Sequence, residues 1–388
     1  MPLMSRMSSR VGIGAVLSAA SVFVAWSESA YSESCGSRAL VGLQEQAGAA
    51  FSTRAPALSV SVKQAEVSPV TWKSPSTDLI RSEQEQPLFH VGSITKTFTA
   101  ALILLLDQER KLRIADPIDG WIDLPSSQGI TVEMLLTHTS GIPDILDLPG
   151  HAAQDSPEDS LAHIVKADPL FLPGTRWKYS NSNYLLLGLI VERVTGQSYA
   201  DVLSEKILQP LELNDTYLWG TEDRQGVLPG FRLACGSIGQ ASCDVGKTYP
   251  LERISNGRDW RVAWSAGGLV STARDLSIWI QALVKGTLLD DAHRKLLLTP
   301  TPLSIAGLNK MGQFNGISWH AMSMGLMQFK LDNGSQVWGH SGYIDGFSAI
   351  AAAGEGLPSM AITVSLEQSN VYELLASGFS KQMCFSAP

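Results

Sequence analysis

The sequence is poor in charge, and it concentrates neither sign. Only 17% of its 388 residues are charged, and the formal net charge is −8. Basic residues form no patch or stripe, so we expect no nucleic-acid partner. Internal repeats and low-complexity tracts are also absent. What the chain does have is 44% hydrophobic residues, enough to bury a large core in one large domain or two intimate ones.

Long hydrophobic runs are lacking except near the N-terminus. Arg6 and Arg10 precede an apolar run at 11–26, and small residues follow it. Basic, then apolar, then small is the order of a secretory signal peptide, here residues 1–30. The alternative is an uncleaved membrane anchor, but the run is short and rich in Ala, Ser and Gly, which favours cleavage. We therefore expect a periplasmic or secreted protein with no stable membrane anchor.

Cysteine is scarce, and none of it is spaced for metal binding. The four cysteines are Cys35, Cys235, Cys243 and Cys384, with no C-x-x-C pair or metal-like cysteine–histidine spacing. An even count in an exported chain indicates two disulfides, for which three pairings are possible. We favour Cys235 with Cys243, which closes a short loop, and Cys35 with Cys384, which joins the chain ends.

The chain is organised around an apolar helix that begins beside a serine and a lysine. Ser93 follows Gly92, Lys96 lies three residues later, and residues 97–106 are apolar apart from two threonines. This run contains no glycine or proline and is apolar on nearly every side. Such a pattern predicts a helix buried in the middle of a large protein.

The spacing of Ser93 and Lys96 has two interpretations, one catalytic and one structural. Residues three apart share a helix face, so the lysine amine can reach the serine oxygen. A lysine partly removed from water loses basicity towards neutral pH, which would activate the alcohol as a nucleophile. The alternative is that Ser93 caps the helix while Lys96 extends to solvent. Because one S-x-x-K is expected by chance in a chain of this length, the motif needs support from elsewhere.

Two further stretches carry polar groups beside predicted helix and strand ends. Tyr179 and Asn181 lie in a loop that leads into a helix, and a phenol can shuttle protons if a nearby cation lowers its pKa. Their alternative roles are aromatic packing and a helix cap. His340 and Gly342 lie at the end of a predicted strand, whose edge can offer an N–H to a developing oxyanion. The alternative there is a glycine-rich turn with a surface histidine.

The order of strand-like and helix-like patterns indicates an α+β fold. An antiparallel sheet is expected from both chain ends, 31–90 and 322–388, beside a helical domain at 91–321 that includes a long exposed loop at 226–261. The expected strands are 58–63, 70–73, 324–331, 336–340, 347–353 and 360–366, with a turn at 341–346. The expected helices are 38–52, 97–106, 131–138, 185–194, 198–208 and 371–381, with helix starts at Ser156 and Thr272.

Three motifs, in this order along the chain, resemble those of the serine β-lactamase/DD-peptidase superfamily. The branch that the chain looks most like is the class C β-lactamase and D-alanyl-D-alanine carboxypeptidase group, which also holds esterases and D-amino-acid amidases. The resemblance implies a β-lactamase/transpeptidase-like fold, with an antiparallel sheet flanked by helices plus an all-helical domain. It spans roughly residues 36–380 and rests on S-x-x-K at 93–96, Y-x-N at 179–181, H-x-G at 340–342 and supporting phrases at 135–141, 173–174 and 266–276.

What the resemblance implies for the chemistry is a covalent acyl-enzyme. Ser93 would be the nucleophile, and Lys96 with Tyr179 would take and return its proton. The backbone N–H groups of Ser93 and Tyr343 would form the oxyanion hole. Asn181 would bind the amide or acyl side chain of the substrate. No metal and no cofactor are implied.

The third motif, with His340 and Gly342 in substrate binding, departs from the β-lactamase pattern. His340 stands where many β-lactamases keep a lysine that attracts the substrate carboxylate, and a histidine is a weaker, pH-dependent cation. This departure weighs against efficient β-lactamase activity, whereas peptidases and esterases of the group often have the H-x-G form. We expect a D-alanyl-D-alanine carboxypeptidase acting on cell-wall-type peptides, with a β-lactamase and an esterase as the alternative enzymes. Two alternatives are not enzymes: a penicillin-binding sensor without turnover and a secreted carbohydrate- or peptide-binding module. We expect a monomer whose partner is a small peptide, ester or β-lactam, and a structural role for His138.

Overall fold

The computed structural model of the chain describes residues 57–64, 68–73, 86–125, 128–221, 226–234, 250–254, 261–286, 288–308, 313–314, 316–367 and 371–381. The predicted signal peptide, the predicted helix at 38–52 and all four cysteines lie outside the described residues. The predicted disulfides, Cys235 with Cys243 and Cys35 with Cys384, therefore remain predictions.

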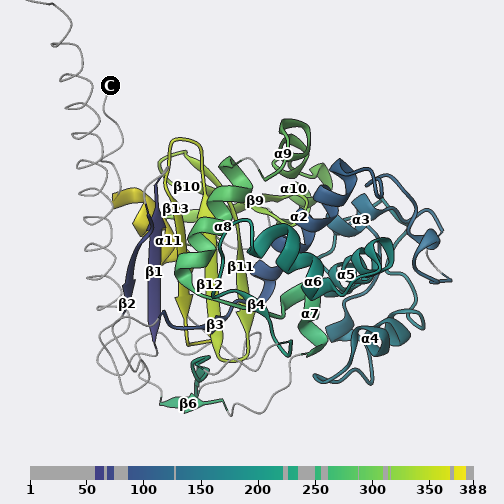
Figure 1. Cartoon of the computed structure of the whole chain (residues 1–388), viewed down its shortest axis with the longest axis horizontal. Helices are drawn as coiled ribbons and strands as arrows, with labels where there is room; N and C mark the ends of the chain where they lie inside the picture. Colours follow the sequence, from purple (N-terminus) through teal and green to yellow (C-terminus); the bar gives the residue numbers. More distant parts are fainter. Residues whose placement is uncertain are drawn as a thin grey trace, which may run out of the picture.

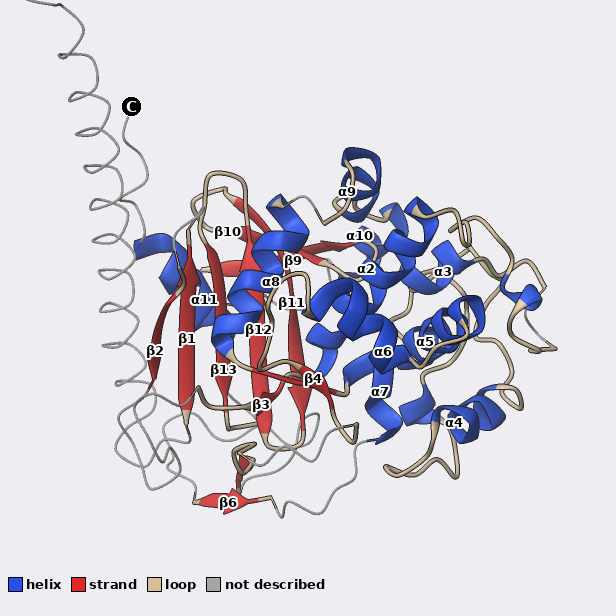
Figure 2. Ribbon diagram, in the orientation of Figure 1, coloured by secondary structure: helices blue, strands red, loops and turns tan. Residues whose placement is uncertain are grey.

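An eight-stranded antiparallel sheet forms one side of the molecule, and most of the helices form the other (Figure 2). The strand order is β2-β1-β13-β12-β11-β10-β9-β8. β1 (Leu58–Lys63) lies between β2 (Val70–Lys73) and β13 (Ser359–Val364), so the sheet is built from both chain ends, as the sequence predicts. The remaining strands are β8 (Gln313–Phe314), β9 (Ile317–Met322), β10 (Met327–Leu331), β11 (Gln336–Ile344) and β12 (Phe347–Ala353).

The sheet differs from the sequence-based expectation in two places. β8 and β9 add residues 313–314 and 317–322 to it, although the sequence predicts a helical domain up to residue 321. β11 continues through Ile344, so the expected turn at 341–346 shrinks to Asp345 and Gly346. Gly342 and Gly346 of the expected turn at 341–346 looked like turn residues, but Gly342 lies inside the strand at a close contact with another segment.

Helices cover both faces of this sheet. α8 (Ala273–Lys285) lies over one face and α11 (Val371–Lys381) over the other (Figure 1). In β1, Val60 joins the apolar cluster that includes α11, whereas Ser61 Oγ lies 3.0 Å from Ser277 Oγ of α8. The alternating pattern of β1 predicted a half-buried strand, but its polar face is buried as well.

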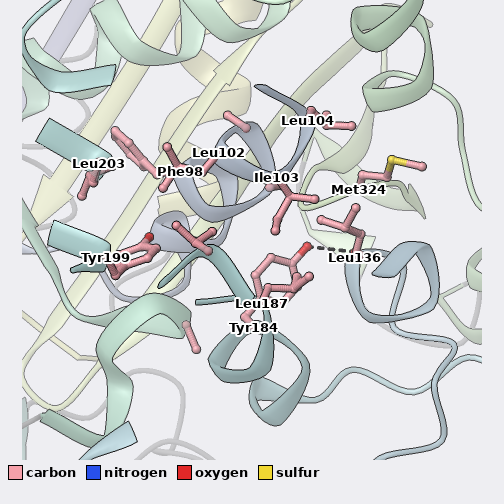
Figure 3. Packing of buried hydrophobic residues seen from close by; sticks show 14 of the residues in the cluster. Phe98, Leu102, Ile103, Leu104, Leu136, Tyr184, Leu187, Tyr199, Leu203 and Met324 are labelled. Carbon is pink, nitrogen blue, oxygen red and sulfur yellow. Dashed lines mark hydrogen bonds between the residues drawn. The ribbon is translucent and has the colours of Figure 1, made fainter. Parts of the chain in front are cut away.

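The helical side is built around α2 (Thr95–Gln108), whose residues 95–106 are all buried. α2 packs against α5 (Asn181–Thr195) and α7 (Trp264–Gly267). Figure 3 shows Phe98 and Ile103 of α2 among the side chains of this core, where the Tyr184 hydroxyl donates to the Leu136 carbonyl at 2.9 Å. The predicted buried helix is therefore confirmed.

The other described elements are short, and several begin where the sequence predicts. α4 (Pro157–Ile164) starts with a capping box formed by Ser156 and Asp159, and Thr272 caps α8. The region 226–261, expected as a loop, holds a two-stranded pair in its described part. No described helix is long and apolar enough to cross a membrane. The remaining elements are α3 (Val132–Leu136), α6 (Tyr199–Leu203), α9 (Asp291–Leu297), α10 (Pro302–Leu308), β3 (Phe89–His90), β4 (Tyr217–Leu218), β5 (Phe231–Leu233), β6 (Leu251–Arg253), β7 (Leu269–Ser271), η1 (Gly92–Ile94), η2 (Ile118–Gly120), η3 (Ile145–Asp147), η4 (Ser204–Leu208) and η5 (Arg261–Ala263).

Candidate active site

Ser93 lies in η1, the single turn that leads into α2, and the end of β11 packs directly on that turn. Gly92 has φ +51, and a Cβ on it would lie 2.9 Å from the backbone nitrogen of Tyr343. A Cβ on Gly342 would overlap the carbonyl oxygen of Val91 and lie 3.0 Å from the backbone nitrogen of Ser93. The two glycines thus let the strand and the turn touch, and the backbone nitrogens of Ser93 and Tyr343 lie close together at this contact.

Lys96 is a fully buried amine surrounded by three oxygen atoms. Its Nζ donates to Ser93 Oγ at 3.0 Å, to Asn181 Oδ1 at 2.7 Å and to the Ala266 carbonyl at 2.6 Å. Burial lowers the pKa of Lys96 to about 7, although the negative charge of Asp144 acts in the opposite direction. Lys96 is therefore poised to exchange a proton near neutral pH.

The three oxygen atoms also decide how a neutral Lys96 is oriented. A neutral amine has two N–H groups and one lone pair. The oxygens of Asn181 and Ala266 are carbonyl oxygens, which can only accept hydrogen bonds. They hold the two N–H groups, so the lone pair points at Ser93 Oγ, where it can receive the hydroxyl proton.

Tyr179 places a second proton-carrying group on the same serine oxygen. Its hydroxyl donates to Ser93 Oγ at 2.9 Å, and Lys96 Nζ lies 5.0 Å from the centre of its ring. From the sequence, proton shuttling by Tyr179 is expected only if a nearby cation lowers its pKa. Burial instead raises this pKa well above its ordinary value, so the phenol is a neutral donor and Lys96 is the better base.

His138 supports Tyr179 from behind. The two rings stack with centroids 4.5 Å apart, and His138 Nδ1 accepts the backbone N–H of Ser180 at 3.2 Å. Burial lowers the pKa of His138 well below its ordinary value, so the imidazole is neutral. These contacts agree with the structural role expected for His138.

The side chain of Asn181 is held at both ends. Its Oδ1 accepts from Lys96, and its Nδ2 donates to Asp144 Oδ2 at 2.9 Å and Oδ1 at 3.1 Å. The backbone N–H of Asn181 also donates to Asp144 Oδ2 at 3.2 Å. The family resemblance implies that Asn181 binds the substrate, whereas here its amide is engaged within the protein.

Asp144 is the site residue that sequence reasoning missed. It follows the phrase at 135–141 and, after Pro143, has the pattern of a cap residue. It does cap η3, since its Oδ1 accepts the backbone N–H of Leu146 at 3.0 Å. Nothing in the local sequence indicates that the same carboxylate also reaches Asn181, 37 residues further along the chain.

His340 is buried, with 2% of its surface exposed, and is not the surface histidine or weak cation that the sequence suggested. Burial, followed by the charge of Lys96, lowers the pKa of His340 to about 3. Its Nδ1 lies 2.5 Å from the carbonyl oxygen of Ser341, and a carbonyl only accepts, so Nδ1 carries the proton. The Nε2 atom is then an unprotonated acceptor with no partner among the described residues.

The assembled groups are those of acyl transfer. An alcohol, an amine near its pKa and a neutral phenol meet at one oxygen atom, beside two backbone nitrogens. Among the described residues, no three His, Asp or Glu side chains gather as a metal site. The residues predicted at 93, 96, 179 and 181 come into direct contact, and the H-x-G strand end packs on η1.

Comparisons with known proteins place this geometry in a family. The Beta-lactamase family model matches residues 76–364. The putative penicillin-binding protein PbpX of Bacillus subtilis is 29% identical over 228 residues, 58% of this chain and 54% of PbpX. This chain thus spans about half the length of that curated relative.

Solved structures with similar folds cover most of the chain. A D-stereospecific amidohydrolase from Streptomyces is 26% identical, with a TM-score of 0.71 over 87% of this chain and 98% of that one. The D-amino acid amidase of Ochrobactrum anthropi, 22% identical, has a TM-score of 0.75 over 88% and 98% of the two chains. The α+β, β-lactamase/transpeptidase-like fold is therefore confirmed, and the chain belongs to the Beta-lactamase family of serine hydrolases.

Proposed function

We propose that this chain hydrolyses short amide and ester substrates through an acyl-enzyme on Ser93. The observation that carries the proposal is the meeting of three side chains at one atom. Ser93 Oγ lies 3.0 Å from Lys96 Nζ and 2.9 Å from the Tyr179 hydroxyl. Lys96 has no exposed surface and a pKa near 7, so it can act as a base where an exposed lysine could not.

In the proposed reaction the same groups transfer protons one way during acylation of Ser93 and the opposite way during deacylation. Neutral Lys96 takes the hydroxyl proton as Ser93 Oγ bonds to the substrate carbonyl carbon, and the backbone N–H groups of Ser93 and Tyr343 stabilise the oxyanion. The bond to the leaving group then breaks. Tyr179 gives its proton to the leaving nitrogen or oxygen and regains one from Lys96. Water attacks the acyl-enzyme by the reverse proton path and frees Ser93.

The candidate substrate classes differ in whether the leaving group carries a free carboxylate. A D-alanyl-D-alanine carboxypeptidase, the class favoured by the sequence, must accept a leaving residue with a free carboxylate. A neutral His340, with its acceptor Nε2 unpartnered, offers that carboxylate neither charge nor a donor. We therefore place D-amino-acid amides and small esters ahead of D-Ala-D-Ala peptides and β-lactams. The likeness to the Streptomyces D-stereospecific amidohydrolase supports this order.

A parallel assay on purified protein tests the function. The substrates are a D-amino-acid amide, a short-chain nitrophenyl ester, a D-Ala-D-Ala tripeptide and a chromogenic cephalosporin. We expect kcat/KM to be higher for the amide and the ester than for the two carboxylate substrates. Ser93→Ala should abolish turnover of all four while the circular dichroism spectrum and Tm stay close to those of the wild type.

Three results would change the assignment. Full activity in Ser93→Ala would end the acyl-enzyme mechanism, whereas a clear preference for the tripeptide would restore the carboxypeptidase. Mass spectrometry after treatment with labelled penicillin addresses the sensor alternative. A stable adduct on Ser93 with no turnover of any substrate would identify a penicillin-binding sensor. Export by the predicted signal peptide remains part of the proposal and is tested by locating the mature chain in cell fractions.

A further inference from the structure

We propose that Asp144 is a positioning residue that fixes the orientation of the Asn181 amide and holds a negative charge near Lys96. The proposal rests on the acyl-enzyme function above and extends it to a residue outside the three motifs. Asp144 touches no reacting atom. It acts on Ser93 through Asn181 and Lys96.

The position of Asp144 determines which end of the Asn181 amide faces Lys96. An amide side chain can present either its oxygen or its nitrogen to a neighbour. Both carboxylate oxygens of Asp144 lie within hydrogen-bond distance of Asn181 Nδ2, at 2.9 and 3.1 Å, so the oxygen of the amide must face Lys96 at 2.7 Å. The reversed amide would set a carbonyl oxygen against the carboxylate, which is repulsive, and would direct an N–H at the lone pair of neutral Lys96 that must receive the proton of Ser93.

The carboxylate is itself held in place. One of its oxygens accepts the backbone N–H of Leu146 within η3, and the other accepts the backbone N–H of Asn181 at the start of α5. Asp144 is therefore tied to two different segments, and the Asn181 amide between it and Lys96 has one favourable orientation.

Asp144 also places a negative charge near Lys96. The groups that face Lys96 come from several elements, and most are neutral. The rings of Tyr179 and Tyr184 lie 5.0 and 5.6 Å from its Nζ, α7 offers only a backbone carbonyl, and His138 and His340 are both kept neutral by burial. Among the described residues, Asp144 is the anion that acts on Lys96, and it raises the pKa of Lys96 against the effect of burial.

A direct titration tests the charge without any substrate. Lysine labelled at Cε with a magnetic carbon isotope gives an NMR signal for each side chain, and the Lys96 signal is the one missing in Lys96→Arg. In Asp144→Asn, which keeps the shape of the side chain, we expect the Lys96 midpoint to move to lower pH. The control is Asp147→Asn, three residues away on the exposed side of η3 and paired with Lys178, which should leave the midpoint in place. An unchanged midpoint in Asp144→Asn would overturn the proposal.

Kinetics test the positioning role on the best substrate of the parallel assay. We expect Asp144→Ala to lower kcat by about 10- to 100-fold, as misplacement of a catalytic group by about 1 Å does, with a smaller effect on KM. Asp144→Asn should shift the acidic limb of kcat/KM to lower pH, and Asp144→Glu should recover part of the loss. If the Asp144 variants had a lower Tm but kept the wild-type pH profile and kcat, the role of Asp144 would be merely structural. Because the NMR titration needs no turnover, failure of the proposed function and failure of this inference give different results.

Discussion

Lys96 shows how a single buried residue sets the working pH of this site. Ordinary lysine is protonated at neutral pH, and a protonated amine cannot take the proton of Ser93. Enclosure by α2, α5 and α7 removes water from the amine and brings its pKa to about 7, while two carbonyl oxygens hold its N–H groups. Burial of the Lys96 side chain in the core thus allows its amine to take the proton of the Ser93 hydroxyl.

The pH profile is the prediction that belongs to this residue. Lys96 must be neutral to act as a base, so kcat/KM should rise as pH increases through about 7 and then level off. Tyr179 should add no limb in the accessible range, since burial raises its pKa. Stopped-flow acylation with a nitrophenyl ester over a pH series measures this limb. A profile that falls as pH rises through neutrality would contradict the role of Lys96 as base.

The site depends on the contact between two elements, β11 and η1. β10 pairs with β11 only as far as Gly339, so residues 340–344 pair with β12 on one edge and approach η1 with the other. This arrangement explains why a motif that resembles a turn is in fact the end of a strand. An edge free of a neighbouring strand is what lets its backbone face Ser93.

Gly342→Ala tests this contact. Its new Cβ would overlap the carbonyl of Val91, so the strand must move away from η1 and carry the Tyr343 N–H with it. We expect kcat to fall by about 10²- to 10³-fold, the usual cost of losing one oxyanion donor, with a stability loss of about 1–3 kcal/mol. Gly120→Ala is the matched control, since a Cβ there meets nothing within 4 Å. Wild-type kcat in folded Gly342→Ala would show that this contact does not shape the oxyanion site.

At the scale of the whole molecule, the buried amine also costs stability. The unfolded chain keeps Lys96 protonated up to about pH 10.4, whereas the folded chain releases the proton near pH 7. Between these two values the unfolded state binds more protons, so the free energy of unfolding rises with pH. Below the folded pKa both states are protonated and this dependence disappears.

Urea unfolding of wild type and Lys96→Met at several pH values measures this effect. The difference in unfolding free energy, wild type minus variant, should increase by about 2 kcal/mol between about pH 7 and pH 9. Using the difference removes the contributions of other titrating groups that the two proteins share. A difference that stays constant with pH would mean that Lys96 keeps its ordinary pKa in the folded protein.

The sequence predicts the larger features of the molecule because they follow from local patterns. The run at 97–106 is apolar on nearly every side and becomes part of the buried α2, and period-two patterns at both chain ends become strands of one sheet. Pairing over long sequence distances is harder to predict. Apolar and polar residues alternate only weakly in β9, so the sequence does not predict this strand. Asp144 has only the local pattern of a helix cap, so its hydrogen bond to Asn181 is seen only in the packed structure.

The measurement that tests the central claim most directly is mass spectrometry of the protein quenched during turnover of a nitrophenyl ester. We expect an increase equal to the acyl group, located after digestion on the peptide that contains Ser93, and no increase in Ser93→Ala. Acylation of a different residue, or turnover by Ser93→Ala with no covalent intermediate, would contradict the account.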